Sequence, residues 1–432
     1  MKKLELLAPA GNILKMKTAF AYGADAVYLG IPDFSLRVRI NDFGLKEVAA
    51  AIKYAHATKK KVYVTINIFA HNAQLQKLPA YLKKLKALKA DALIISDPGI
   101  IALVKKTWPS AIIHLSTQAN CTNSEAVKFW AKQGVRRIIL GREVTLMEIK
   151  EIHQAAPNVE LEYFVHGAMC MAYSGRCFLS KLFTARSGNL GDCAQPCRWE
   201  YDVSRYGLKT GGHPEELELV EERHGSYLLN SKDLCLLKYL PELVEAGVTS
   251  FKIEGRAKSV YYQAMVGGIY RRALMRLEKN PPPAKLKKEL DWLFSELKTK
   301  LVHRGYTAGF LLGEKADQNI SNSHEVSAWE FCGQVLEEMP APLRRNLAKL
   351  KLINPLVFQV HNTIRRNEKI EIIRPGYDII ELRPTALWDA KTGVKISAAH
   401  GGGGGQIAIL DLPENAGLVP PLSVIRRLIN NI

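Results

Sequence analysis

Four of the chain's cysteines, Cys170, Cys177, Cys193 and Cys197, lie in one short window of the sequence. The chain has only 7 cysteines among its 432 residues, so this concentration is not typical of cysteines that merely fill a core. Cysteine thiolates are standard ligands of zinc and of iron–sulfur clusters. The window therefore predicts a metal site.

The spacing of the four cysteines distinguishes the two kinds of metal site. It reads C-x6-C-x15-C-x3-C, and only the last pair, in CAQPC, resembles the tight knuckles of structural zinc sites. A cluster with several irons can take ligands from separated loops, so the irregular spacing favours a [4Fe–4S] cluster, with zinc as the alternative. Cys235, in NSKDLCLL, is expected to open the following helix and is an alternative fourth ligand to Cys197.

The segments around these cysteines alternate between short apolar runs and amphipathic stretches. This pattern is typical of parallel strands connected by helices, and eight repeats predict a closed (β/α)₈ barrel of the TIM type. A doubly wound open sheet is the alternative. The expected strands are 4–8, 25–30, 61–67, 91–97, 111–116, 136–141, 159–167 and 249–255, and the expected helices are 12–22, 45–58, 74–89, 98–107, 123–134, 145–154, 233–246 and 258–280.

Polar residues follow most of the predicted strands at their carboxyl ends, where barrels of this kind carry their active sites. Each of these residues by itself is typical of a helix cap or a loop. Together, on one predicted face, they indicate a polar pocket. The expected catalytic residues are His166, Gln118, Glu254 and Arg256, and the expected substrate-binding residues are Asn67, Asn120, Arg142 and Glu143.

One long connection, after the seventh strand, breaks the regular alternation. A structureless loop of such length is uncommon unless it is functional, and all four clustered cysteines lie in it. Beyond the barrel, short strands without a good helix between them predict a small C-terminal β-barrel that is a candidate for RNA binding. The expected domains are the barrel at 1–280 with the cluster-binding insertion at 167–231, a helical transition at 281–328, and the β-barrel domain at 329–432.

Composition and charge narrow the class of protein. With 47% hydrophobic and 24% charged residues the chain resembles a folded globular protein, and no apolar run is long enough to span a bilayer. Glu5 interrupts the short apolar start, so we expect no signal peptide and a cytoplasmic location. The formal net charge of +18 makes RNA a plausible partner, and we expect neither a membrane nor DNA as a partner. A solvated, lysine-rich surface is the alternative interpretation of this charge.

Several strings in the chain form a family signature. They are APAGN at 8–12, GADAVYLG at 23–30, FSLRVR at 34–39, HLSTQAN at 114–120, EYFVHGAMCMAYSGRCFLS at 162–180, CRWEY at 197–201 and FKIEGRAKS at 251–259. In this order they closely resemble the peptidase U32 family, the collagenase-like proteases, and within it the tRNA hydroxylation branch. HRGYTAGF and the β-rich tail extend the resemblance to nearly the whole chain.

This resemblance implies a barrel enzyme that carries an iron–sulfur cluster on the four clustered cysteines. It also implies hydroxylation of the wobble uridine of tRNA to 5-hydroxyuridine, with prephenate as a required metabolite. Two arginines, Arg37 and Arg39, are expected to hold a carboxylate or phosphate by bidentate contacts, with plain surface charge as the alternative. Tyr173 and Trp199 are expected to stack on the target base, or else to shield the cluster from solvent.

Three other functions stay open at this point. A peptidase, as the family name suggests, finds little support, because the chain has neither an HExxH zinc motif nor a GxSxG elbow. Ribosomal RNA is an alternative substrate, since a relative within the family modifies it. A non-catalytic RNA-binding protein is the third alternative.

Overall fold

The computed structural model describes residues 3–31, 34–35, 43–170, 172, 177, 179–184, 186, 193–199, 230–313, 318–319, 324–402 and 405–429. By its contacts the chain divides into two units. The first consists of Met1–Ile13, Asp25–Ala257 and Val302–Glu325, and the second of Leu14–Ala24, Lys258–Leu301 and Val326–Ile432. The domain boundaries expected from the sequence stay a prediction.

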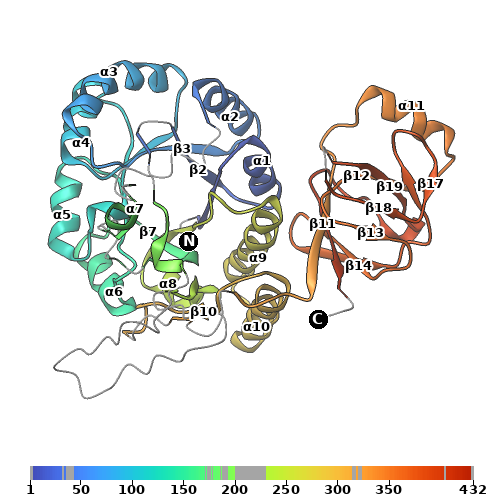
Figure 1. Cartoon of the computed structure of the whole chain (residues 1–432). Coiled ribbons are helices and arrows are strands. Elements are labelled where there is room, and N and C mark those ends of the chain that lie inside the picture. Colours follow the sequence, from blue (N-terminus) through green and yellow to red (C-terminus); the bar gives the residue numbers. More distant parts are fainter. Residues whose placement is uncertain are drawn as a thin grey trace, which may run out of the picture. The chain divides into compact units, whose positions relative to one another are not determined.

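Eight parallel strands close into a barrel in the first unit (Figure 1). Strand β1 pairs with β2 on one side and with β9 on the other, and β9 also pairs with β7, which completes the ring. The predicted (β/α)₈ barrel is therefore confirmed, and the open sheet is excluded. The strands are β1 (Glu5–Pro9), β2 (Ala26–Gly30), β3 (Lys61–Ile66), β4 (Ala92–Ile95), β5 (Ile113–Leu115), β6 (Arg137–Ile139), β7 (Glu160–Ala168) and β9 (Val248–Ile253).

Side-chain caps fix several of the helices that follow these strands. Asp97 accepts a hydrogen bond from the backbone N–H of Ile100 at 2.9 Å, and Thr145 forms a capping box with Glu148. The caps hold the strand-to-helix loops at the carboxyl end of the barrel. The helical elements of this unit are α2 (Leu45–Ala57), α3 (Asn72–Ala87), α4 (Pro98–Thr107), η2 (Thr117–Ala119), α5 (Ser124–Lys132), α6 (Leu146–Ala155), α7 (Leu179–Thr184), η4 (Pro196–Arg198), η5 (Leu237–Tyr239) and α8 (Leu240–Glu245).

The helix predicted at 233–246 begins instead as a short strand, β8 (Asp233–Cys235). This strand runs antiparallel to the carboxyl end of β7, with His166 opposite Cys235, and β10 (Tyr306–Thr307) adds to its other side. The prediction that Cys235 opens a helix was wrong, because backbone groups at the end of β7 offer this segment a pairing partner. The helical part begins only at Leu237.

Besides its C-terminal region, which holds the sheets and one more helix, the second unit has three helices. The helices are α1 (Ile13–Ala21), α9 (Val260–Glu278) and α10 (Pro283–Lys300). The buried Tyr22 hydroxyl, just after α1, donates to the Ile373 carbonyl at 2.6 Å and accepts from the Val424 N–H at 3.1 Å. These bonds join α1 to the C-terminal sheet. In the described part of the chain, no helix has both the length and the hydrophobicity needed to cross a membrane.

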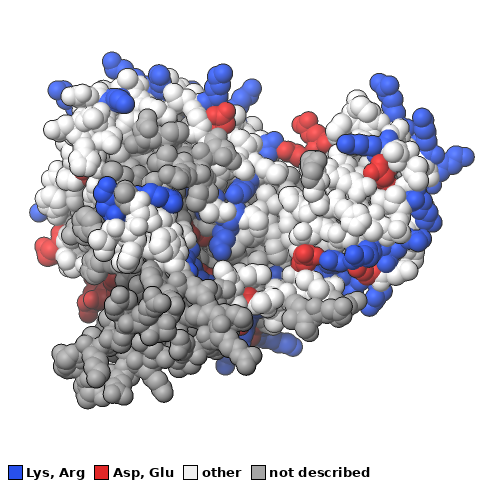
Figure 2. Space-filling model, viewed as in Figure 1, with Lys and Arg blue, Asp and Glu red and all other residues white. Residues whose placement is uncertain are grey.

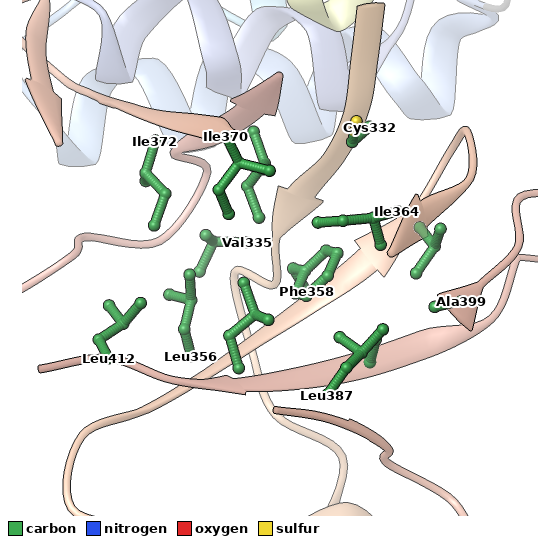
Figure 3. Close-up of a cluster of buried hydrophobic side chains, with 14 residues drawn as sticks. Cys332, Val335, Leu356, Phe358, Ile364, Ile370, Ile372, Leu387, Ala399 and Leu412 are labelled. Atoms are coloured by element: carbon green, nitrogen blue, oxygen red, sulfur yellow. The ribbon is translucent and has the colours of Figure 1, made fainter. Parts of the chain in front are cut away.

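Where the sequence predicts a small β-barrel, the C-terminal region contains an antiparallel sheet. Its core is a cluster of buried apolar side chains around Phe358, Val335 and Ile370, which point toward one another from different strands (Figure 3). In spatial order the strands are β15 (Asp378–Leu382), β14 (Ile370–Arg374), β20 (Val424–Leu428), β11 (Trp329–Val335), β12 (Pro355–Val360), β19 (Ile407–Asp411), β16 (Leu387–Asp389) and β17 (Lys395–Ile396), with β13 (Ile364–Arg365) and β18 (Ala398–Ala399) as a separate pair and η6 (Glu414–Ala416) as a helical turn.

A helix interrupts this region, contrary to the sequence-based expectation. Helix α11 (Ala341–Lys349) begins with proline at its first turn and places Leu343 and Leu347 on one face. That face packs on the sheet beside Val357 and Ile409. The expectation of short strands without a helix between them was wrong here, because LAKLKLIN at 347–354 alternates like a strand but spans the end of this helix and the turn after it.

Candidate functional site

A cavity of about 210 Å³ opens at the carboxyl ends of the barrel strands. Barrels of this kind carry their active sites at this end. The lining combines strand residues, residues of the strand-to-helix loops and residues of the long connection after β7. They are Tyr28, Thr65, Asn67, Ile94, Ser116, Thr117, Gln118, Ile139, Arg142, Phe164, Ala168, Met169, Cys170, Cys177, Cys193, Gln195, Cys197, Arg198, Lys252, Glu254 and Arg256.

All four clustered cysteines line this one cavity. Cys170 follows the end of β7, and Cys197 lies in η4. Gln195 adopts a left-handed backbone conformation (φ 59°), and its N–H donates to the Sγ of Cys193 at 3.3 Å. The Arg198 side chain donates to the Gln195 Oε1 at 2.8 Å and supports this turn. The loop thus presents its thiols to the cavity and supplies a hydrogen bond to one sulfur.

The cysteines around the cavity influence one another's ionisation. Burial raises the pKa of the Cys197 thiol, Arg198 opposes this effect, and the neighbouring cysteines Cys170, Cys193 and Cys177 raise the pKa further. Ionised sulfurs at these four positions would therefore repel one another, and a bound cationic centre would relieve that repulsion. The donor set fits a thiolate-ligated metal centre. Within the described ranges, no three His, Cys, Asp or Glu side chains are positioned to share one metal ion.

Arg256 is a buried cation on the cavity wall. It is 6% exposed, and its guanidinium donates to the Ser35 hydroxyl at 2.9 Å. Space for this contact exists because residue 30 is glycine, since a Cβ at Gly30 would lie 2.0 Å from Ser35 Oγ and 2.5 Å from Arg256 Nη1. The end of β2 therefore sets the position of the arginine.

Lys252 forms part of the cavity floor and was missed by sequence reasoning. It is 4% exposed, and its Nζ donates to Glu162 Oε1 at 2.7 Å. Burial lowers the pKa of Lys252, while the Glu162 carboxylate opposes that shift. The ring of Tyr28 lies 4.3 Å from the same nitrogen. The signal in the sequence was a charged residue in the middle of each of two largely apolar strands, Glu162 in VELEYFVHG and Lys252 in TSFKIEG.

Five of the predicted polar residues come together on the cavity wall. Gln118 has a buried Oε1 without a hydrogen-bond partner, and Arg142 lies over the ring of Phe164 at 3.9 Å. These positions agree with the idea that the carboxyl ends of the strands form one polar pocket. The five residues are Asn67, Gln118, Arg142, Glu254 and Arg256.

His166 does not line the cavity, although Glu162, Phe164 and Ala168 on the same strand point toward the barrel interior or the cavity. The β7–β9 register shifts between Phe164 and His166, and such an irregularity re-aims a side chain. The His166 ring instead lies 5.5 Å from the ring of Tyr306 and is 2% exposed.

The other predicted residues lie elsewhere. Asn120 is left-handed (φ 51°), and its buried amide atoms have no partner, but neither it nor Glu143 lines the cavity. Cys235 is 5% exposed and is not a lining residue. Trp199 is 40% exposed, with the ring of Phe183 at 6.4 Å. The predictions for Arg37, Arg39 and Tyr173 fall outside the described residues.

Comparison with known proteins identifies relatives over most of the chain. Residues 11–321 match the model of Peptidase family U32, which confirms the resemblance seen in the motifs. An Escherichia coli (strain K12) protein named tRNA hydroxylation protein P is 41% identical over 389 residues, which cover 81% of this chain and 84% of the relative. In Bacillus subtilis (strain 168), tRNA hydroxylation protein P1 is 35% identical over 92% of this chain and 90% of its own length. A second Escherichia coli relative, a 23S rRNA 5-hydroxycytidine synthase, is 36% identical over 73% of this chain and 46% of its own length.

Proposed function

The chain belongs to peptidase family U32, and we propose that it is a tRNA-modifying enzyme that hydroxylates the wobble uridine to 5-hydroxyuridine. The observation that carries this proposal is the convergence of four cysteines, Gln118 and a set of cations on one cavity at the catalytic end of the barrel. The names of the relatives support tRNA as the substrate. Prephenate is the proposed co-substrate, and the cytoplasm the proposed location.

We propose that Cys170, Cys177, Cys193 and Cys197 hold a [4Fe–4S] cluster. Their common cavity supports this choice, and the place of Cys235 away from the lining favours Cys197 as the fourth ligand. When bound, such a cluster supplies redox chemistry, whose potential depends on hydrogen bonds to its sulfurs. The N–H donated to Cys193 is one such bond.

The polar wall is proposed to hold the substrates. Glu162 neutralises Lys252, but Arg142, Arg198 and Arg256 outnumber Glu254 on the lining, and this net positive charge suits an anionic co-substrate. A uracil must leave its stack to reach such a cavity. The unpartnered Oε1 of Gln118 can accept a hydrogen bond from the imide N–H of that uracil.

Ribosomal RNA is the second candidate substrate, because one relative is named for 23S rRNA. That relative is much longer than this chain, which spans 46% of it. Mass analysis of both RNA classes from the same cells separates the two candidates.

The test is a deletion strain that also lacks any paralogue of the gene. We expect 5-hydroxyuridine and its derivatives to disappear from its tRNA, and to return with the wild-type gene but not with Cys177→Ser. Anaerobically purified protein should contain iron and sulfide in a ratio near one and absorb in the visible range. A colourless protein with one tightly bound zinc contradicts the cluster, and unchanged 5-hydroxyuridine contradicts the activity. Cleavage of denatured collagen that depends on Cys170 would instead support a peptidase.

A further inference from the structure

One side of the second unit carries exposed cations that have no acidic partner among the residues that the structure describes. Four belong to α11 and the turn after it, one belongs to the turn between β16 and β17, and one is the first residue of β17. Between residues 339 and 354 the sequence has no Asp or Glu. We call these six residues the basic surface: Arg344, Arg345, Lys349, Lys351, Lys391 and Lys395.

Contacts between α11 and the β16–β17 turn make this a continuous surface. The Asn346 side chain donates to the Lys391 carbonyl at 2.6 Å. A Cβ built on Gly393 would lie 3.7 Å from Leu350 Cδ2. In Figure 2, Lys and Arg side chains crowd the side of this unit where Figure 1 shows α11 and β17.

The basic surface differs in its charge balance from the opposite edge of the same sheet. None of its six cations forms an ion pair with a described residue. The nearby Asp389 carboxylate accepts hydrogen bonds from the backbone of its own turn and from Gln406 at 2.8 Å. At the β15–β14–β20 edge, in contrast, cations are paired, as in Arg374 with Asp378, Lys369 with Glu381 at 2.9 Å, and Arg427 with Glu330 at 2.7 Å.

The form of the basic surface suits a nucleic acid better than a lipid surface. A groove of about 310 Å³ with an apolar floor runs between Arg344 and Lys351. The leucines of α11 pack on the sheet, whereas a helix that lies on a membrane keeps its large apolar face free. Cations spread over two rigid elements match phosphates spaced along a strand.

We propose that the basic surface binds the phosphate backbone of the RNA substrate. This inference rests on the proposed function only for the identity of that RNA as tRNA. Binding through phosphates gives affinity without sequence preference, so selection of the uridine is left to the cavity.

A charge-matched pair of variants tests this inference. The first carries Arg345→Gln, Lys349→Gln, Lys391→Gln and Lys395→Gln, all at exposed positions for which no side-chain hydrogen bond is seen. The control removes three exposed lysines of α3 and one just after it, as Lys83→Gln, Lys84→Gln, Lys86→Gln and Lys89→Gln. Both proteins lose the same charge.

Binding is measured by fluorescence anisotropy with an unmodified tRNA transcript between 50 and 300 mM salt. Because each phosphate contact contributes about 0.7–0.9 to the slope of log K against log salt, we expect the slope of the first variant to fall by about 3 and its affinity at ~0.1 M salt to fall ~10- to 100-fold. The control should change less than ~3-fold. Equal losses in both variants, or wild-type binding by the first, overturn the inference.

Two further outcomes keep this inference separate from the proposed function. If tRNA binding depends on the basic surface but no 5-hydroxyuridine forms in cells, the inference holds and the proposed function fails. If these residues are needed for binding phosphatidylglycerol vesicles and not for binding tRNA, the inference is overturned while the proposed function stands.

Discussion

Replacing Lys252 by methionine should destabilise the barrel far more than the same change at an exposed lysine. The Glu162 carboxylate is 0% exposed and lies 2.7 Å from Lys252 Nζ. Removing one partner of a buried ion pair leaves the other charge buried and unpaired, which lowers the free energy of unfolding by about 3–5 kcal/mol. In the variant, Glu162 still accepts hydrogen bonds from Arg137 Nη1 at 3.2 Å and from Ser250 Oγ at 3.1 Å. We therefore expect a loss at the lower end of this range, about 3 kcal/mol.

The matched control is Lys150→Met. Lys150 pairs with Glu245 at 3.3 Å, but the two side chains are 54% and 75% exposed, so this change should cost less than about 0.5 kcal/mol. With an unfolding entropy of about 2 cal/mol/K per residue, the loss of ~3 kcal/mol lowers the Tm of a unit of this size by roughly 5 °C. Differential scanning calorimetry of both variants measures this shift.

A double variant, Lys252→Met with Glu162→Gln, removes the stranded charge as well. It should therefore be more stable than the sum of the two single changes predicts, by about 1–2 kcal/mol. If Lys252→Met lowers Tm no more than Lys150→Met does, the buried ion pair between Lys252 and Glu162 does not stabilise the barrel as argued.

Three more predictions concern the cysteines, the acid stability and the end of β2. Cys177→Ser should abolish iron binding and 5-hydroxyuridine formation with little change in apoprotein Tm. The control Cys332→Ser, in the C-terminal core, should lower Tm and leave the iron content unchanged. Full iron in the Cys177 variant would count against the cluster site. Burial raises the pKa of Glu5, but its ion pair with the buried Arg137 outweighs this effect and the pKa is lowered. The contribution of Glu5 to stability is therefore complete above about pH 4.5 and is lost as the pH falls through the lowered pKa. The Tm difference between wild type and Glu5→Gln should shrink between about pH 5 and pH 3, and a constant difference would contradict this. Gly30→Ala should displace Arg256 and lower the free energy of unfolding by about 1–3 kcal/mol. It should also reduce 5-hydroxyuridine in complemented cells. Normal activity of this variant would show that the position of Arg256 has no role in the reaction.

The strands and helices of the barrel were largely predictable, because parallel strands buried on both faces are nearly continuous apolar runs. The five polar residues of the cavity wall were predictable for a related reason, since the carboxyl ends of such strands meet at one end of the barrel. The short β8 was not. Its apolar string around Cys235 fits a helix or a strand equally well, and the end of β7 decides between them by pairing with it.

Long-range pairing explains the other omissions. Lys252 and Glu162 stand 90 residues apart in the chain, so neither strand alone shows that the two charges neutralise each other. Helix α11 was missed because alternating leucine and lysine residues resemble a half-exposed strand. Its leucines are instead held by Val357 and Ile409 of the sheet.

The sequence by itself determined the set of four cysteines, their irregular spacing and the barrel end on which they lie. Only the tertiary structure decided which polar residues face the cavity with them. His166 and Gln118 are equally polar and equally close to a strand end, yet the register shift after Phe164 turns His166 toward Tyr306, while the turn after β5 directs Gln118 into the cavity. The physical reason is that a side chain's direction depends on the hydrogen-bond register between strands far apart in the chain, which no local pattern encodes.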